Sequence, residues 1–482
     1  MRFTSFEFPL FAGAVLVLYY TVPKRGQWVL LLAASYGFYL WAGVRYLAFI
    51  LFTTLTTYGA ARLMERSRAR YGKKDAKSRN RRWLIACLSV NFGLLFVCKL
   101  RLLRGTALPL GISFYMFQSM GYVTDVYRGT VRAERNLFKL ALFVSFFPQL
   151  VQGPISRFSQ LAPQLYQPHG FDGKRVSFGL QRMLWGYFKK LVIADRIAPA
   201  VAALKGQECT GASFLLLTVL YGVQAYGDFT GGIDIALGFS QTLGIELAEN
   251  FDHPFRATNT AEYWRRWHIS LGAWMKDYIF YPISVSRPMR KLSKAARAKL
   301  GRFGKRLPVY AAAATTWFVT GIWHGLTPNF VLWGMLNCLV IVVSEELSPL
   351  YEKFHRRFRL KEKRWYDGFE RVRMFLLMDL IRACDLFPDV GAYFRGIGSL
   401  FSGLRWQGLG LSGLDCVILS LGIGLMAAVS LVQEKRGSVR ELLWRGNAVV
   451  RWTLIFTLFL IVLLMGSYGA GYDAGNFIYN QF

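Results

Sequence analysis

The sequence is poor in acidic residues and lacks cysteine motifs. Its 482 residues include 28 Asp and Glu against 59 Lys and Arg, which gives a formal net charge of +31 at pH 7. The six cysteines follow no CxxC or other metal-ligand spacing, so neither a disulfide framework nor a zinc site is predicted. No serine-hydrolase elbow, Walker loop, dinucleotide fingerprint or internal repeat occurs. These absences predict a protein without a bound metal and outside the enzyme classes that such motifs define.

Apolar and aromatic residues dominate the rest of the sequence. Hydrophobic residues make up 54% of the chain and aromatic residues 16%, a composition typical of a polytopic membrane protein. The basic residues gather in blocks between apolar runs, which is the pattern of cytoplasmic loops and not of a nucleic-acid-binding face. We therefore predict contact with the lipid bilayer and no nucleic-acid partner. The four strongest basic blocks, all predicted to be cytoplasmic, are residues 62–82, 286–306, 352–373 and 434–451.

The apolar runs extend from residues 6–22 to residues 452–468, and several are short or interrupted by Gly and Pro. We expect about eleven membrane-spanning helices with additional re-entrant or interfacial pieces. The positions of the basic blocks predict that both termini lie outside the cytoplasm. The first run shows no convincing cleavage site, so we interpret it as a retained span. Residues 1–482 are predicted to form one all-α integral membrane domain.

Two of the five histidines lie in aromatic, apolar sequence. His268 occurs in WRRWHISLGAWMKDY and His324 in TTWFVTGIWHGLTPNF, whereas His169, His253 and His355 lie in polar connections or at an element boundary. An ionisable side chain at membrane depth is costly and is by default a functional candidate. Histidine is also well suited to move a proton near neutral pH. His268 and His324 are therefore catalytic candidates, and a neutral imidazole bonded within a helix bundle is the alternative for each.

The segment 262–278 has the pattern of an amphipathic helix. A helical projection places His268 at the edge of an aromatic face, with charged residues on the opposite face. A helix this charged cannot span a membrane, so we expect it at the cytoplasmic interface. Its basic residues, beside block 286–306, could attract a polyanionic cytosolic donor, and lipid headgroup binding or a plain interfacial anchor explains the same pattern. The candidate donor-binding residues are Arg265, Arg266, Trp267 and Lys276.

Two carboxylates, Asp228 and Asp234, lie in the apolar, Gly-rich stretch YGVQAYGDFTGGIDIALGFS. Carboxylates in such a stretch need partners or a water-filled cavity. We expect structural ion pairs, with Lys189 or Lys190 as the partner, in preference to catalysis. The glycines permit a close helix approach or a broken helix. In an alternative from another functional class, the two carboxylates are the ion sites of a polysaccharide or lipid transporter, although no inverted repeat supports it.

Several specific motifs of the chain are shared with a known family. The run ENFDHPFRATNTAEYWRRWHISLGAWMKDYIFYP and the later GIWHG are the most specific, and PLGISFYMFQSMGYVTDVYRG, FFPQLVQGPI and GYFKKLVIADRIA extend the match over most of residues 1–345. These motifs resemble the bacterial membrane-bound O-acyltransferase family, in particular its alginate O-acetyltransferase and D-alanyl transfer branches. The chain departs from the family at residues 284–288, where SVSRP replaces the usual GG, and residues 346–468 match weakly.

The resemblance implies a ring of tilted helices around a central funnel in a bacterial plasma (inner) membrane. On this resemblance His324 of GIWHG is the essential histidine and His268 of WHISL its companion. The implied acyl donor is acetyl-CoA, which arrives from the cytoplasm. A phosphopantetheinyl carrier protein is the alternative donor, for transfer of D-alanine to teichoic acid. The implied partner is an extracellular or membrane-anchored SGNH-type O-acyltransferase, which passes the acyl group to a secreted or cell-wall polysaccharide.

The sequence ends on FIYNQF, residues 477–482. This stretch is similar to an F-x-Y-x-x-F ending of some of these acyl-transfer systems, in which the tyrosine carries the acyl group, and Tyr479 is therefore a candidate carrier. A phenol has a pKa of about 10 and a thiol of about 8.5, so an acyl group can move from a thioester to Tyr479 with little energetic loss. The tail 469–482 can extend about 45 Å, against a half-bilayer of about 15 Å. An aromatic anchor at the headgroup belt is the alternative for the tail.

Taken with the resemblance, these features predict an O-acyltransferase. His324 would be the general base on the incoming hydroxyl, His268 would orient or polarise the donor, and Tyr479 would relay the acyl group. A scaffold that only recruits the external transferase is a further alternative. It predicts that His324 and Tyr479 can both be replaced without loss of polymer modification.

Overall fold

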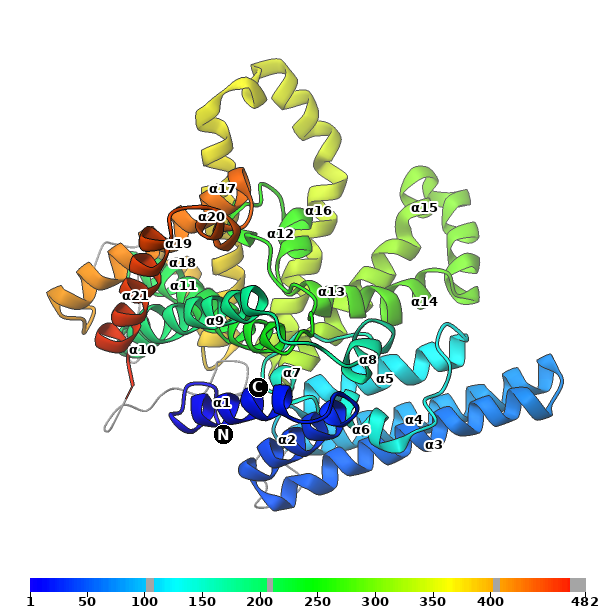
Figure 1. Cartoon of the computed structure of the whole chain (residues 1–482). Helices are drawn as coiled ribbons and strands as arrows, with labels where there is room; N and C mark the ends of the chain where they lie inside the picture. Colours follow the sequence, from blue (N-terminus) through cyan, green and yellow to red (C-terminus); the bar gives the residue numbers. More distant parts are fainter. Residues whose placement is uncertain (101–107, 206–210, 402–407, 469–482) are drawn as a thin grey trace. The chain divides into compact units, whose positions relative to one another are not determined.

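The computed structural model describes residues 1–100, 108–205, 211–401 and 408–468. Within these residues the chain is helical and forms no β-strand, apart from an isolated antiparallel bridge between Phe251 and Trp267. Figure 1 shows the helices in chain order. The all-α prediction is confirmed.

Among the described residues, five helices are long and apolar enough to cross a membrane. This agrees with a polytopic membrane protein. The estimate of about eleven spanning helices stays a prediction, because several of the expected apolar runs form shorter or broken helices. The five candidate spans are α3 (Leu47–Arg70), α4 (Lys73–Lys99), α16 (Pro328–Phe358), α19 (Gly413–Arg436) and α21 (Ala448–Met465).

The helices group into two compact units, each assembled from segments that are far apart in the sequence. The first unit contains residues 1–196, 226–248 and 417–482, and the second contains residues 197–225 and 249–416. Because the chain passes back and forth between them, neither unit is a contiguous stretch. The prediction of a single domain stays a prediction.

The first unit is built on a packed set of N-terminal helices. Its shorter helices are α1 (Glu7–Thr21), α2 (Gln27–Ala42), α5 (Ile112–Arg128), α6 (Leu137–Ser145), α7 (Phe147–Leu150), α8 (Phe158–Tyr166), α9 (Gly173–Tyr187) and α20 (Val439–Arg445), with short turns η1 (Lys24–Gly26) and η2 (Val44–Tyr46). Here α3 packs against α4, α5 and α6, and α1 packs against α2 (Figure 1). The α1 helix ends at Thr21 because Val22 precedes Pro23, and a residue before proline disfavours the helical conformation.

A buried cluster of ion pairs joins α9 and its continuation to α11 (Ala212–Thr242) in the first unit. Lys190 Nζ lies 2.5 Å from Asp228 Oδ1 and 2.7 Å from Asp195 Oδ1. Lys189 Nζ lies 2.6 Å from Asp234 Oδ2. Both lysines belong to the π-helical segment η3 (Phe188–Ala194), which continues into α10 (Asp195–Lys205). The prediction that lysines 189 and 190 hold the two carboxylates of α11 is confirmed.

Glycines allow α9 and α11 to pack in backbone contact. A Cβ on Gly186 would lie 2.6 Å from the carbonyl oxygen of Gly231, and a Cβ on Gly179 would lie 2.5 Å from that of Gly238. Real Cβ atoms do not approach other atoms this closely. The close helix approach predicted for this Gly-rich stretch is therefore confirmed at Gly231.

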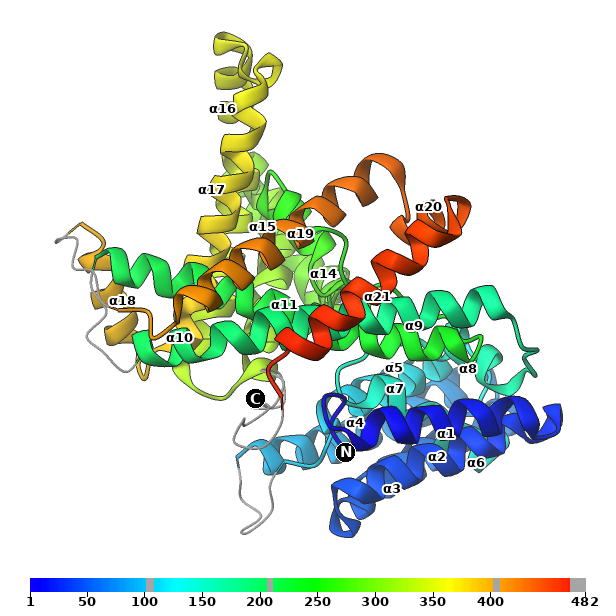
Figure 2. The same ribbon diagram turned by 60° about the vertical axis from the view of Figure 1, so that its left-hand side comes forward.

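The second unit contains the remaining helices. They are α12 (Thr260–Arg266), α13 (Ile269–Met275), α14 (Tyr281–Ser284), α15 (Arg287–His324), α17 (Arg364–Arg382) and α18 (Val390–Ser399), with short segments η4 (Pro254–Arg256), η5 (Lys276–Phe280), η6 (Leu360–Glu362) and η7 (Ala383–Leu386). The long α15 is kinked at Gly301, whose φ is 53°, and its second part packs against α16. Figures 1 and 2 show α16 and α17 as a pair joined by a turn, which contains part of the basic block 352–373.

Candidate functional site

His324 is the last residue of α15, at the point where the chain turns into α16. Gly325 leaves the helix with an extended backbone, and α16 begins at Pro328. The centroid of the His324 ring lies 4.7 Å from that of Trp323 and 4.8 Å from that of Trp333, edge to face in both pairs. His324 is 7% exposed. The histidine of GIWHG is thus buried between two indole rings.

The two glycines of GIWHG bring α15 against α16. A Cβ on Gly321 would lie 2.5 Å from the carbonyl oxygen of Phe330, and a Cβ on Gly325 would overlap the Phe330 ring. On the facing helix, a Cβ on Gly334 would clash with the carbonyl oxygen of Trp317. Glycine is therefore required for this helix contact, which holds the histidine against the indole of α16.

The prediction of one continuous helix over residues 262–278 is wrong. The α12 helix ends before Trp267, His268 has a left-handed backbone (φ 49°, ψ 51°), and α13 starts anew after it. Trp267 pairs with Phe251 in the antiparallel bridge, so its backbone serves a contact that a continuous helix would not make. Lys276 then begins the π-helical segment η5, a second departure from the α-helical pattern.

Asn250 fixes the orientation of His268. The Asn250 side-chain oxygen Oδ1 accepts hydrogen bonds from the backbone N–H of Ser270 at 3.0 Å and from its hydroxyl at 2.9 Å. The same oxygen lies 3.2 Å from Nδ1 of His268, and the backbone oxygen of Asn250 accepts from the N–H of Ile269 at 3.0 Å. Because Oδ1 is an acceptor in these bonds, Nδ1 of His268 is the donor. The neutral imidazole therefore carries its lone pair on Nε2.

The structure brings His268 and His324 to the same indole. The ring centroid of His268 lies 6.1 Å from that of Trp323, the residue that precedes and contacts His324. Trp264 on α12 extends this aromatic group, since its centroid lies 4.7 Å from that of Trp317 and 5.8 Å from that of Trp333. We call Trp264, Trp317, Trp323 and Trp333 the tryptophan cluster. It places two imidazoles from distant parts of the sequence in one buried, aromatic setting.

Burial lowers the pKa of His268 from 6.5 to about 3, because the charged imidazolium loses its hydration. The unfolded chain therefore binds a proton between pH 6.5 and about 3 that the folded chain does not bind. We expect stability to be complete above pH 6.5 and to fall as the pH is lowered toward 3. The slope would approach about 1.4 kcal/mol per pH unit for this single group.

Thermal unfolding of the detergent-solubilised protein between pH 7.5 and 5, compared with the His268→Gln variant, measures this effect. The wild type should lose stability more steeply than the variant on acidification, because glutamine does not titrate. Equal slopes would contradict the burial of a neutral imidazole.

The predicted donor-binding residues fall into two groups. Arg265 and Lys276 are exposed at the surface of the second unit. Arg266 is engaged locally: its Nη2 lies 2.9 Å from Glu262 Oε1, within α12. Trp267 is 2% exposed and packs inside the unit. The assignment of donor binding to these four residues stays a prediction; among them, Arg265 and Lys276 are the exposed cations.

Sequence reasoning missed the residues that orient the two histidines. Asn250 stands in the ENFDHPF stretch, 18 residues before His268, and no local periodicity connects the two. Trp333 lies on α16, whereas His324 ends α15. The indole Nε1 of Trp264 donates a hydrogen bond of 3.2 Å to Asn337, which also lies on α16. Only a contact between separate elements reveals these roles.

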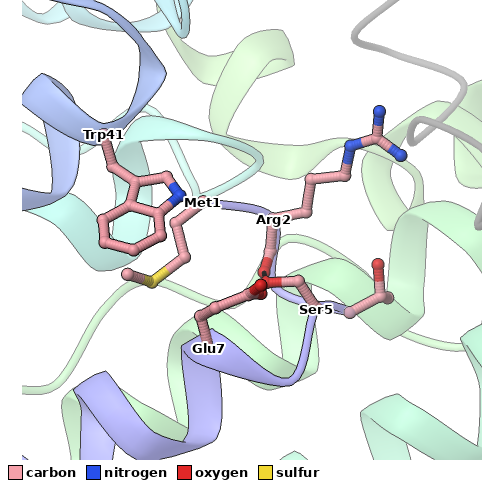
Figure 3. Close-up of a pocket in the computed structure, with 6 residues that line it drawn as sticks. Met1, Arg2, Ser5, Glu7 and Trp41 are labelled. Atoms are coloured by element: carbon pink, nitrogen blue, oxygen red, sulfur yellow. Dashed lines mark hydrogen bonds between the residues drawn. The ribbon is translucent and has the colours of Figure 1, made fainter.

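A pocket of about 310 Å³ lies in the first unit, near the start of the sequence (Figure 3). None of the predicted site residues lines it. The pocket is lined by Met1, Arg2, Thr4, Ser5, Glu7 and Trp41.

Among the residues that the structure describes, no group of His, Cys, Asp or Glu side chains is placed to hold a metal ion. Tyr479 lies outside the described residues.

Comparisons with known proteins agree on one family. Residues 131–384 match the model described as MBOAT, membrane-bound O-acyltransferase family. A probable alginate O-acetylase of Azotobacter vinelandii is 33% identical over 361 residues, which are 70% of this chain and 66% of the relative. A probable alginate O-acetylase of Pseudomonas putida is 33% identical over 489 residues, and the alignment covers 95% of this chain and 93% of the relative. A peptidoglycan O-acetyltransferase of Helicobacter pylori is 29% identical over 369 residues, and the alignment covers 67% of this chain and 66% of the relative. The first and third alignments thus span slightly less than two thirds of the relatives' length.

Proposed function

The chain belongs to the membrane-bound O-acyltransferase family, a family of acyltransferases of polytopic membrane architecture, and from this we propose that it transfers acetyl groups for O-acetylation of an extracellular or cell-wall polysaccharide. The observation that carries the proposal is the pair His268 and His324 around the indole of Trp323. The names of the relatives, an alginate O-acetylase and a peptidoglycan O-acetyltransferase, support acetyl as the group and a glycan hydroxyl as the final acceptor.

In this proposal His324 is the general base. It accepts the proton of the incoming hydroxyl as the oxygen attacks the carbonyl carbon of the thioester. The tetrahedral intermediate then breaks its C–S bond, and the proton on the imidazole is available to the departing thiolate. A phenol with a pKa of about 10 needs such a base at pH 7. The indoles of Trp323 and Trp333 around His324 exclude water, which would otherwise compete for the thioester.

His268 orients the donor in the same proposal. Its Nδ1–H is held by Asn250, so its Nε2 is the nitrogen that can accept a hydrogen bond. A neutral imidazole with an acceptor nitrogen can position a donor N–H or O–H group but cannot polarise a carbonyl oxygen. The contacts of His268 thus favour orientation over polarisation, the two roles that the sequence left open.

The donor is acetyl-CoA, delivered from the cytoplasm. Its phosphates would be attracted by exposed cations, and Arg265 and Lys276 have the exposure that this role requires. The first part of α15 carries the basic block 286–306 in the same unit and adds to the positive field. The external partner is an SGNH-type O-acyltransferase that accepts the acetyl group and passes it to the polysaccharide.

Tyr479 is the proposed carrier between these two enzymes. The residues just before the tail are held in the first unit, where the backbone N–H of Ser467 donates to the carbonyl oxygen of Leu191 at 2.9 Å and Arg196 donates to the carbonyl oxygen of Met465. An aryl ester at Tyr479 is about as good an acyl donor as the thioester, because phenol and thiol have similar acidity. Transfer from this ester to an aliphatic hydroxyl then runs downhill.

Replacing Tyr479 by phenylalanine is expected to reduce acetylation of the glycan by at least about 100-fold, because the acceptor oxygen of a covalent step is lost. Slow hydrolysis of acetyl-CoA should persist, since His324 and the donor site are unchanged. The measurement follows labelled acetyl-CoA into glycan in membranes that also contain the partner.

Tyr468→Phe is the matched control for this variant. Tyr468 lies eleven residues earlier, and its hydroxyl donates to the carbonyl oxygen of Leu463 without a proposed chemical role. Glycan acetylation in Tyr479→Phe at the level of Tyr468→Phe would remove the relay from the proposal and leave the enzyme. Transfer from a D-alanyl carrier protein, with acetyl-CoA inert, would instead show that the cargo is D-alanine.

A further inference from the structure

Arg382 contacts the His268 segment from a distant part of the sequence. It is the last residue of α17, and its guanidinium carbon lies 4.0 Å from the ring centroid of Trp267. Its Nη2 donates a hydrogen bond of 2.5 Å to the hydroxyl of Tyr263. The side chain of Arg382 is 12% exposed, so the cation is largely removed from water where it meets the indole. A cation–π contact is strongest under these conditions.

Asp379 lies beside Arg382 on the same helix, and burial raises the pKa of its carboxyl to about 8, so this group is mostly uncharged at pH 7. Its Oδ1 lies 3.8 Å from Nε of Arg382, and the residue is 1% exposed. A Cβ on Gly222 of α11 would overlap the Asp379 carboxylate, so α11 approaches the carboxylate directly at this glycine. The carboxyl of Asp379 thus packs against both α11 and the guanidinium of Arg382.

Trp267 transmits this restraint to His268. It immediately precedes His268, and its ring is stacked on that of Tyr263 with centroids 5.7 Å apart and an angle of 12° between the planes. The left-handed backbone of His268 is unfavourable for a residue with a side chain and persists only where the surroundings impose it. Asn250 holds the residues that follow, and Arg382 with Tyr263 holds the residue that precedes.

We infer that Arg382 is a positioning residue for His268, acting through the ring of Trp267. This assigns a role in the site to the helix α17, which lies in the part of the chain where the sequence predicted none. The consequence for turnover rests on the proposed acyl transfer, whereas the consequence for the order of the His268 segment does not.

The test uses Arg382→Lys, which keeps the charge and removes the planar fork that covers the indole and reaches Tyr263. Hydrogen exchange of the full-length protein in detergent should show about tenfold faster exchange at the amides of Ile269 and Ser270, which bond to Asn250. Exchange in the second part of α15 and in α16 should be unchanged. With acetyl-CoA, kcat should fall by about tenfold and KM should stay within about twofold.

Arg371→Lys is the matched control, because Arg371 lies on the same helix and pairs with Asp367 at 2.8 Å outside this network. It should leave both readouts at the wild-type level. Tyr263→Phe, which removes the hydroxyl that accepts from Arg382 and keeps the ring, should reproduce the Arg382→Lys pattern at smaller amplitude. This second variant serves if Arg382→Lys fails to fold.

A double-mutant cycle with His268→Ala separates positioning from a general structural role. Arg382→Lys should cost no further activity in the His268→Ala background. An equal loss in both backgrounds, or unchanged exchange at Ile269 and Ser270, overturns the inference; if His268→Ala has no activity, the exchange at these two amides decides. Faster local exchange in a protein that transfers no acyl group would leave the positioning role in place and refute the proposed function.

Discussion

Replacing His324 by alanine is expected to lower acetyl transfer from acetyl-CoA by about 10²–10⁴-fold, the range that a general base contributes. The imidazole is 7% exposed and stands between Trp323 and Trp333, so neither bulk water nor a nearby exposed side chain can replace it as a proton acceptor. Labelled acetyl-CoA and membranes that contain wild type or variant measure the effect.

The His324→Gln variant separates lost chemistry from lost packing. Glutamine fills most of the volume between the two indoles but is not a base, so it should be as inactive as alanine while unfolding close to the wild-type temperature. His355→Ala is a control, because His355 lies at the far end of α16, where its Nε2 and the Tyr366 hydroxyl share a hydrogen bond of 2.8 Å. Wild-type transfer in either His324 variant would favour the scaffold alternative.

Replacing Lys190 by methionine is expected to destabilise the first unit by about 3–5 kcal/mol, because one buried cation serves two carboxylates. Lys190 is 0% exposed and lies within 2.7 Å of Asp195 and Asp228. Its loss leaves two buried negative charges that repel each other. The thermal unfolding midpoint of the purified protein in detergent measures the change.

Two further variants show whether charge balance is the cause. Lys190→Met combined with Asp195→Asn and Asp228→Asn should recover most of the lost stability, because no uncompensated charge remains. Lys174→Met breaks an exposed pair with Glu441 and should cost about 0–1 kcal/mol. If the triple variant keeps acyl transfer, the cluster is structural; if it folds and loses acyl transfer, the cluster takes part in the function as well as in the fold.

The sequence drew attention to the two histidines and predicted the ion pairs because both signals are local. An ionisable residue inside an apolar, aromatic run stands out by composition, as His268, His324 and Asp228 do. The Lys189–Asp234 and Lys190–Asp228 pairs followed from the need of such carboxylates for a counter-charge, and the structure confirms them.

The backbone around His268 could not be predicted in the same way. A helical projection assumes that residues 262–278 satisfy their own backbone groups, whereas Trp267 pairs with Phe251 and Asn250 takes up the N–H groups after His268. Periodicity within one segment carries no information about a competing partner elsewhere. The contact of Arg382 with Trp267 joins residues 115 positions apart, so it cannot be predicted from periodicity within one segment either.

The weak match of residues 346–468 also hid the role of α17 from the sequence. The alignment with the Pseudomonas putida relative covers 95% of the chain and so extends well into this part, but it assigns no function to a residue. The structure supplies that step, because it places Arg382 against Tyr263 of α12 and against Trp267, which follows α12.

Mass spectrometry of the C-terminal peptide tests the central claim most directly. The purified protein in sealed vesicles is given acetyl-CoA on the cytoplasmic side, and the peptide that contains Tyr479 is then examined for the added mass of one acetyl group. We predict an adduct on Tyr479 in the wild type and none in His324→Ala. An equal adduct in His324→Ala, or an unmodified Tyr479 in wild-type protein that is acetylating its glycan, would contradict transfer of the acyl group to this tyrosine with His324 as the general base.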